Sequence, residues 1–409
     1  MRLISAERLA TVFGALPGIP RVVAGGNFAT PWRALALLDS AIAEYRLFML
    51  NAQAGVPDRD GVILESPFVG PGMRGRDGLR YFPCRLSLVP VMLSTTIPPD
   101  VVLVQTSVPA SGTVSLGTEV NVLPGAIEAA HARGGIVIAQ LNRSVPYTYG
   151  DAVLSSDDID YAIEVDAPLP SPPSRPCTEA YAVIGERVAE LVGDAMTLQL
   201  GISAVPDAVL EALTGRRGLM VWSEMFSDGV LSLAKAGALA PDRVITASFA
   251  FGSPELYDWM DRNPGLLMLR TETTNDPAQI ARQPRMVSVN SALQVDLFAQ
   301  ANAARVHGMI HSGFGGQTDF VVGALHSPGG LAIIALPSWH PKADVSTVVP
   351  CLAGPVTSFQ HSYFVSEQGT AAIWGHDASD QAENIITQVA HPSVRDELRT
   401  AGKGLGFRA

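Results

Sequence analysis

The sequence of 409 residues predicts an α/β fold built from two open α/β domains with mainly parallel sheets. In both halves of the chain, continuous apolar runs of strand length alternate with helical patterns. Strands that are apolar on both faces are typical of parallel sheets covered by helices on both sides. Five prolines within residues 167–176 separate the halves, because proline continues neither a helix nor a central strand.

The first half reads as alternating strands and helices in chain order. The predicted elements are a strand at 22–27 ending in a glycine turn, a helix from 30 to 42 with proline near its start, an ordered loop around short strands at 56–85, a strand at 101–107, a helix at 124–133 and a strand at 135–142. The last two strands end in polar residues, at the edge where open α/β sheets bind ligands.

The second half repeats this kind of pattern. The predicted elements are a helix at 180–192, a strand at 196–200, a helix through 209–213 that stops at Gly215, and strands at 219–222, 243–249, 286–290 and 331–336. We therefore expect a first α/β domain at 1–170, a proline-rich linker at 171–177 and a second α/β domain at 178–409.

Composition excludes several classes of protein. With 47% hydrophobic and 16% charged residues the chain is compact, and its mean hydropathy of +0.22 favours an oligomer interface. It has no apolar segment of membrane-spanning length, and its amino terminus does not resemble a secretory signal, so we expect a cytoplasmic protein. A net charge of −11 without a dense basic run argues against nucleic acid and anionic membranes as partners.

No metal site is expected from the sequence. The three cysteines lie far apart, without the spacing of a zinc site or a disulfide framework. His307 and His311 have the i, i+4 spacing of a metal pair, but no third ligand lies near them in sequence. The serine-hydrolase elbow, the Walker pattern and the dinucleotide fingerprint are all missing.

Glu224 is the first candidate for chemistry. It follows the apolar run 219–222 and opens the sequence Glu-Met-Phe-Ser-Asp-Gly, which puts a carboxylate at a strand end. Alpha/beta enzymes place their reacting groups there. The alternative is a solvated loop residue or a neighbour of a helix N-cap.

Two glycine-containing turns are candidates for anion binding. The turn Gly201–Val205 joins a strand to a helix, so its N–H groups and the helix dipole favour an anion or an oxyanion. The stretch Ser312–Phe320 has three glycines in four residues and permits close backbone approach to a ligand. The alternative for the first turn is a tight connection that binds nothing.

Several separated segments together resemble the acetyl-CoA hydrolase/transferase family, in the branch of class I CoA-transferases that includes 4-hydroxybutyrate CoA-transferases. The matching segments are 105–107 with 112–117, 142–150, 157–161, 198–208, 223–229, 289–297, 312–320, 366–369 and 391–398. The order of these segments along the chain is that of the family.

This resemblance implies two open α/β domains of the CoA-transferase (NagB/RpiA-like) type, with the active site in the cleft between them. It implies that Glu224 attacks an acyl-CoA thioester, and that a glutamyl-CoA thioester then forms in a ping-pong transfer of CoA to a carboxylic acid. It also implies a homodimer that uses coenzyme A as substrate, with no permanently bound cofactor. The residues that would contact CoA are Gly201, Ile202, Ser203, Ala204, Val205, Gly315, Gly316 and, for the phosphates, Lys342.

The sequence also departs from the family pattern. Ser203 stands where the family usually has glycine, and Thr347 where it has arginine. Ala372 and Trp374 replace an acid and an arginine, which suggests that packing takes the place of an ion pair. Two other functions therefore stay open: an acyl-CoA hydrolase on the same scaffold, and a CoA-binding protein of weak activity.

Overall fold

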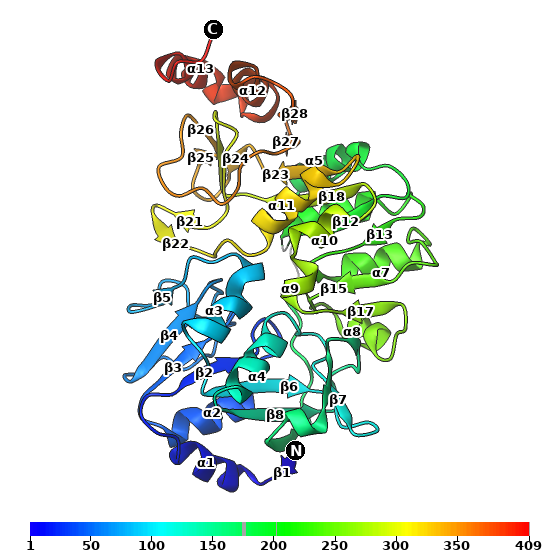
Figure 1. Cartoon of the computed structure of the whole chain (residues 1–409). Helices are drawn as coiled ribbons and strands as arrows, with labels where there is room; N and C mark the ends of the chain where they lie inside the picture. The colour runs from blue at the N-terminus through cyan, green and yellow to red at the C-terminus, as the bar shows by residue number, and fades with distance from the viewer. Residues whose placement is uncertain (174–176, 202, 409) are drawn as a thin grey trace. The chain divides into compact units, whose positions relative to one another are not determined.

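The computed structural model describes residues 1–173, 177–201 and 203–408. The chain packs into two compact units (Figure 1). The first unit comprises Met1–Pro173, Val244–Thr274 and Ile310–Gly315, and the second comprises Ser174–Arg243, Asn275–Met309 and Gly316–Ala409.

The first unit is organised around an eight-stranded, wholly parallel sheet. Its strands in spatial order are β1 (Arg2–Leu3), β11 (Tyr161–Val165), β8 (Ile136–Asn142), β6 (Val101–Thr106), β2 (Arg21–Ala24), β3 (Tyr45–Phe48), β4 (Val62–Ser66) and β5 (Arg80–Tyr81). The strands predicted at 22–27, 101–107 and 135–142 are confirmed as β2, β6 and β8.

Helices cover both faces of this sheet. The helices of the unit are α1 (Ala6–Gly14), α2 (Trp32–Ala41), η1 (Leu86–Leu88), α3 (Val89–Thr95), α4 (Leu123–His131), η2 (Ser156–Asp158), α8 (Pro254–Met260) and α9 (Thr271–Thr274). Val101 and Leu103 of β6 share a core cluster with α1 and α2. Because side chains alternate along a strand, Val102 and Val104 face the other side, and α4 packs against β6 and β8.

A buried polar cluster lies at the carboxyl edge of this sheet, where the strand order changes direction between β2 and β6. Asn27 Nδ2 donates to both oxygens of Glu119 at 3.0 and 2.8 Å, and Asn121 Nδ2 donates to one of them at 2.6 Å. Burial raises the pKa of Glu119 to about 7, although the amide donors lower it. The first unit therefore holds a buried carboxyl group that titrates near neutral pH.

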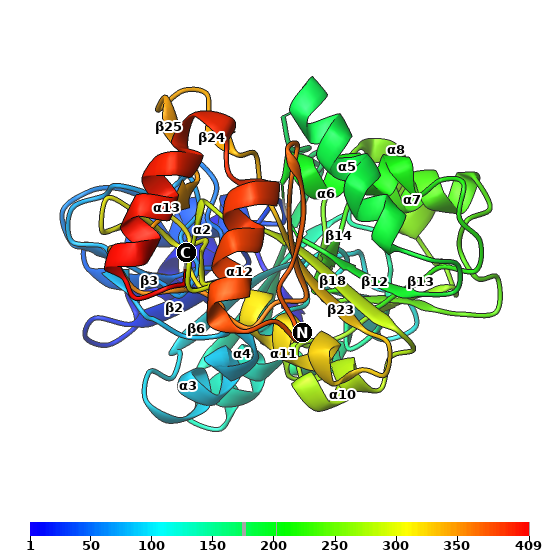
Figure 2. The ribbon, with the colours of Figure 1, turned by 90° about the horizontal axis from the view of Figure 1, so that it is seen from above.

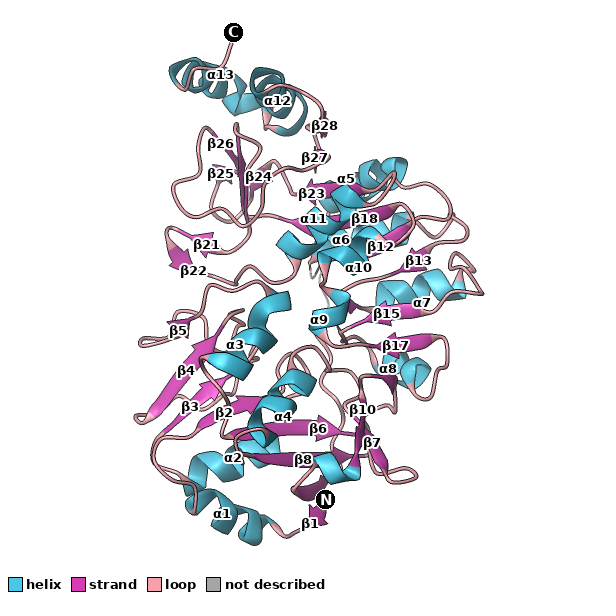
Figure 3. Cartoon of the chain, in the orientation of Figure 1, coloured by secondary structure: helices cyan, strands magenta, loops and turns pink. Residues whose placement is uncertain are grey.

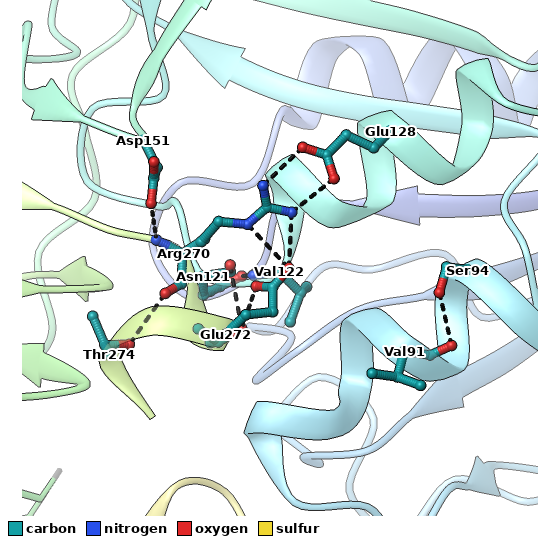
Figure 4. A network of polar contacts seen from close by, with 10 residues as sticks. Val91, Ser94, Asn121, Val122, Glu128, Asp151, Arg270, Glu272 and Thr274 are labelled. Carbon is teal, nitrogen blue, oxygen red and sulfur yellow. Dashed lines mark hydrogen bonds and ion pairs between the residues drawn. The ribbon is translucent and has the colours of Figure 1, made fainter. Parts of the chain in front are cut away.

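Residues 244–274 pack with the first unit because their strands join it. Strands β15 (Ile245–Ala247) and β17 (Leu266–Met268) form a parallel sheet with β9 (Tyr149–Gly150). Beyond β17, the Arg270 guanidinium binds the Glu128 carboxylate through two bonds of 2.7 and 2.8 Å and also binds Glu272 (Figure 4). The smaller strands of the unit are β7 (Thr113–Ser115), paired with β10 (Val153–Ser155), and β16 (Phe249–Ala250).

The compact units differ from the continuous domains expected at 1–170 and 178–409. Residues 244–274 and 310–315 follow the proline-rich stretch in sequence but pack with the first unit. Pairing of β17 with β9 across more than a hundred residues is the physical reason for the first of these segments. The domain boundaries at 1–170 and 178–409 stay a prediction.

The second unit contains a six-stranded sheet in which five strands are parallel and the last is antiparallel. Its strands in spatial order are β13 (Met220–Val221), β12 (Thr197–Leu200), β18 (Met286–Ser291), β23 (Leu331–Ala335), β27 (Tyr363–Ser366) and β28 (Gly369–Ala372). The mainly parallel α/β fold predicted from the sequence is confirmed in both units.

Helices also cover both faces of the second sheet (Figure 2). Helices α5 (Glu179–Leu191) and α6 (Ala204–Ala212) share one core cluster with β12, β18 and β23. Helices α10 (Pro277–Ala281) and α11 (Gln317–His326) pack on the opposite face around Phe320. A third cluster lies between the β23–β27 side of the sheet, helix α12 (Ala378–Asn384) and helix α13 (Arg395–Gly404).

The remaining elements of the second half are short (Figure 3). They are β14 (Met225–Phe226), α7 (Asp228–Lys235), β19 (Gln294–Asp296), β20 (Ala301–Asn302), β21 (Arg305–Val306), β22 (Met309–Ile310), β24 (Trp339–His340), β25 (Val345–Ser346), β26 (Val348–Val349), the π-helix η3 (Ile385–Val389) and η4 (Pro392–Val394). Across the described ranges, none of the helices has the length and apolar character needed to cross a membrane.

Candidate active site

Glu224 lies at the carboxyl edge of the second sheet, directly behind β13. Trp222 continues the pairing of β13 with β12 through a bond of 3.1 Å from its N–H to the carbonyl of Leu198. Ser223 is buried, and its hydroxyl accepts from the N–H of Leu200 at 3.4 Å. These contacts fix the backbone just before Glu224 against β12.

Two donors hold the Glu224 carboxylate. Asn275 Nδ2 donates to Oε2 at 2.8 Å, and the backbone N–H of Gly316 donates to the same carboxylate group. Asn275 is fully buried, and it follows directly after helix α9 in the sequence. The carboxylate of Asp319, which is also fully buried, acts on Glu224 as a nearby negative charge.

The pKa of Glu224 is raised to about 7, and the largest cause is desolvation by burial. The negative charge of Asp319 raises it further, whereas the bonds from Asn275 and Gly316 lower it. The residue as a whole is only partly buried, although its carboxyl group is poorly hydrated. Near neutral pH the group therefore exists in both ionisation states and can act as a nucleophile or exchange a proton.

Gly316 leaves no room for a side chain. A Cβ at this position would overlap Oε2 of Glu224 and Nδ2 of Asn275. Its φ of −93° is open to any residue, so the requirement for glycine comes from the close approach and not from the backbone. Gly316 is also the N-cap of α11, whose ten residues direct the positive end of the helix dipole toward the carboxylate.

The predicted turn at Gly201–Val205 lies after β12 and leads into α6. Leu200, just before it, is the residue bonded to Ser223, so the turn begins beside the segment that carries Glu224. Ser203 has φ −164° and ψ 175°, which is extended backbone that any residue adopts. The serine in place of glycine is therefore compatible with this turn, and its hydroxyl lies 2.6 Å from that of Ser291. Ile202 lies outside the described residues.

A buried network supports the same edge of the sheet. Gln199 and Asn290 exchange amide bonds of 3.3 and 3.1 Å, and the hydroxyl of Ser288 donates to Gln199 Oε1 at 2.6 Å. All three are polar side chains on the central strands β12 and β18, and all are buried. Satisfied buried networks of this kind rigidify the elements that carry them.

The other candidate residues lie in different surroundings. Gly315 precedes Gly316 with a φ of +56°, which favours glycine, and packs with the first unit. Lys342 is exposed in the turn between β24 and β25, and no contact joins it to Glu224 among the described residues. Thr347 is buried and its hydroxyl donates to the carbonyl of Pro337 at 2.6 Å. The structure therefore brings Gly316 directly to Glu224, but not Lys342.

A cavity of about 610 Å³ opens on the second unit away from Glu224. Its lining combines aromatic and amide side chains and includes Phe298, Gln300, Phe359, His361, Trp374 and Gln381. Trp374 is 61% exposed, so core packing does not replace the ion pair whose loss the sequence suggested.

Within residues 1–173, 177–201 and 203–408, no three His, Cys, Asp or Glu side chains are grouped as metal ligands.

Two residues of the site were not assigned a role from the sequence. Asn275 lies 51 positions from Glu224 and sits in an Asn-Asp-Pro sequence that signals only a turn before a helix. Asp319 belongs to the glycine-rich segment 312–320, in which the sequence pattern draws attention to the glycines and not to the acid. The signal that could identify Asp319 is its position as an acid in the first turn of a helix that begins at a glycine.

A desolvated glutamate held by amide donors can act as a nucleophile that forms a covalent intermediate, and the same donors can stabilise an oxyanion. Residues 252–401 match the model of the acetyl-CoA hydrolase/transferase C-terminal domain. The chain is 38% identical to 4-hydroxybutyrate coenzyme A transferase of Clostridium kluyveri, over 78% of this chain and 76% of that protein. It is 35% identical to a succinyl-CoA:acetate/propanoyl-CoA:succinate CoA transferase of Fasciola hepatica, over 95% and 86%.

A solved structure matches this chain over its whole length. RipA from Yersinia pestis superposes with a TM-score of 0.92 at 28% identity, over 100% of this chain and 98% of that one. Acetyl-CoA hydrolases are more distant, as in Eremothecium gossypii, with 31% identity over 52% of this chain and 41% of the hydrolase. The chain belongs to the acetyl-CoA hydrolase/transferase family, a family of enzymes.

Proposed function

We propose that this protein is an acyl-CoA:carboxylate CoA-transferase in which Glu224 carries CoA covalently. The observation that carries the proposal is the environment of Glu224: a desolvated carboxyl group with a pKa of about 7 that accepts from Asn275 and from the N–H of Gly316. The relatives at 35–38% identity are CoA-transferases, which supports transfer over other acyl chemistry.

The first half-reaction makes and breaks two bonds in turn. The Glu224 carboxylate attacks the thioester carbonyl of an acyl-CoA, and the CoA thiolate leaves to give an acyl-glutamyl anhydride. The thiolate then attacks the glutamyl carbonyl, the acyl group leaves as a free carboxylate, and a glutamyl-CoA thioester remains. A second carboxylate reverses these steps and leaves as the new acyl-CoA, which gives ping-pong kinetics.

The contacts of Glu224 suit this sequence. Attack on the glutamyl carbonyl puts negative charge on an oxygen of Glu224, and the donors from Asn275 and Gly316 already point to this carboxyl group. Fixed donors stabilise such an oxyanion without reorganising during the reaction. Low hydration favours attack by the carboxylate, and exclusion of water protects the thioester from hydrolysis.

Residues near the carboxyl edge would bind the rest of the substrate. We assign contacts with CoA near its thioester to Gly201, Ile202, Ser203, Ala204, Val205, Gly315 and Gly316. Lys342, as a compact exposed cation, would meet the CoA phosphates. CoA then acts as a substrate and no cofactor is permanently bound. The acceptor would be a small carboxylic acid, and we further propose that the enzyme is a cytoplasmic homodimer.

Hydrolysis is the second candidate function, because acetyl-CoA hydrolases occur among the more distant relatives. In a hydrolase, water would attack the anhydride or the glutamyl-CoA thioester at the same Glu224. The two functions differ in whether turnover needs an added carboxylate.

The experiment follows loss of acetyl-CoA, butyryl-CoA and succinyl-CoA with and without acetate, succinate or 4-hydroxybutyrate. We expect turnover to require the carboxylate and a new CoA ester to form from it. Turnover at the same rate in water alone would replace the transferase by the hydrolase. Glu224→Gln should abolish both activities while Glu211→Gln, an exposed glutamate on α6, should keep them. Full transferase activity of Glu224→Gln would refute the assignment.

A further inference from the structure

A line of buried hydrogen bonds begins at Gln317, the first residue of α11 and the neighbour of Gly316. Gln317 Nε2 lies 2.8 Å from Ser358 Oγ, and Ser358 Oγ lies 2.9 Å from His361 Nε2. On its other side, His361 Nδ1 lies 3.3 Å from the carbonyl oxygen of Ala299. Gln317, Ser358 and His361 are 8%, 1% and 0% exposed, so water does not supply these partners.

The direction of every bond in this line follows from its last acceptor. A carbonyl only accepts, so His361 Nδ1 carries the proton that bonds to Ala299. Burial lowers the pKa of His361 to about 3, so the ring is neutral and its Nε2 accepts. The Ser358 hydroxyl therefore donates to His361 and accepts from the amide of Gln317.

A second link holds the same turn of α11. The hydroxyl of Thr318 donates to the carbonyl of Thr357 at 3.0 Å, next to Ser358. The segment at Ser358 is itself paired with Ala301 through backbone bonds of 2.9 and 3.2 Å. The first two residues of α11 are thus attached to one fixed segment, while Gly316 just before them donates to Glu224.

We propose that Ser358 and His361 are positioning residues for CoA transfer: they fix the first turn of α11 so that the N–H of Gly316 points at the Glu224 carboxylate. The inference rests on the proposed function, because it requires Glu224 to be the reacting group. A small displacement of an oxyanion donor lowers the rate of the chemical step more than it lowers substrate binding.

The test compares Ser358→Ala with a matched control in the same segment. Ser362→Ala also removes a buried hydroxyl, one that accepts from the N–H of Ala332 at 3.0 Å and has no bond to α11. We expect Ser358→Ala to lower kcat about tenfold with KM for acyl-CoA changed less than about twofold. Its pH–rate profile should also rise at higher pH than that of the wild type, because a weaker bond from Gly316 no longer lowers the pKa of Glu224 as far.

His361 supplies a second, independent pair of variants. His361→Gln keeps an acceptor for Ser358 and a donor for Ala299, whereas His361→Leu removes both. We expect the glutamine variant to keep most of kcat and the leucine variant to lose as much as Ser358→Ala. Melting temperatures of all four variants separate loss of folding from loss of rate.

Equal kcat and equal pH profiles for Ser358→Ala and Ser362→Ala would overturn the inference, as would equal kcat for the two His361 variants. Such results leave the proposed function intact when Glu224→Gln is inactive. Full activity of Glu224→Gln would instead refute the proposed function itself.

Discussion

Replacement of Gly316 by alanine tests the geometry of the site most sharply. The added Cβ would overlap Glu224 Oε2 and Asn275 Nδ2, so the carboxylate must move away from both of its donors. Loss of one oxyanion donor typically lowers kcat by about 10²- to 10³-fold. Because the two donors act on one group, their losses do not add. We expect kcat to fall about 10³-fold, or about 4 kcal/mol of transition-state stabilisation.

The fold should tolerate this change. The φ of −93° at Gly316 is accessible to alanine, and alanine in place of an N-cap residue typically costs about 1 kcal/mol or less of stability relative to glycine. Gly354→Ala is the matched control, because its Cβ would meet no atom within 4 Å. The assay measures initial rates of CoA transfer together with the melting temperature.

The contradicting result is specific. If Gly316→Ala keeps kcat within about threefold of the wild type while folding normally, the carboxylate does not need the contact with Gly316. The role assigned to this N–H would then be wrong. Equal losses in Gly316→Ala and Gly354→Ala would point to general destabilisation instead.

Three further predictions concern single side chains. Asn275→Ala should lower kcat about 10- to 100-fold, because it removes a donor to the Glu224 carboxylate. It should also move the rise of the pH–rate profile above about pH 7, because the bond from Asn275 lowers the pKa of Glu224, and an unchanged profile would contradict this. Ser203→Gly should change kcat/KM less than about threefold, because Ser203 is already extended at φ −164°, and a large gain would show a strained turn. Folding raises the pKa of Glu119 to about 7, so ionisation of this buried group lowers the stability of the protein as pH rises from about 4.5 through 7. Glu119→Gln should therefore raise the melting temperature more at about pH 8 than at about pH 5. An equal change at both pH values would contradict the raised pKa.

The strands that the sequence predicts are those that are apolar on both faces. Runs such as Val101–Val104 and Leu331–Leu336 are buried throughout or nearly so, and their pattern fits no surface element. The sequence pattern does not predict strands such as β3 and β28. In β3 the run is interrupted by Arg46, and β28 consists of small residues that carry little strand signal. Pairing with adjacent strands, and not local propensity, makes these segments strands.

The candidate site also contains residues that the local sequence reveals and residues that only folding brings together. Glu224 is visible in the sequence because one short segment carries the strand, the carboxylate and the following turn. Asn275 is not visible, because it reaches Glu224 only after the chain folds across 51 positions. The sequence also leaves the φ angle of Ser203 undetermined, because a serine in place of glycine does not reveal whether a positive φ is needed. Tertiary packing decides both the contact between Asn275 and Glu224 and the backbone angle at Ser203.

The central claim is that Glu224 itself carries CoA. Its most direct test is to incubate the enzyme with an acyl-CoA, reduce it with borohydride and measure the peptide Gly218–Lys235 by mass spectrometry. Cleavage after lysine and arginine leaves Glu224 as the single glutamate of this peptide. We predict conversion of its carboxyl to an alcohol, seen as loss of one oxygen and gain of two hydrogens at Glu224, only when acyl-CoA is present. An unmodified peptide from an enzyme that turns over CoA esters would contradict the claim.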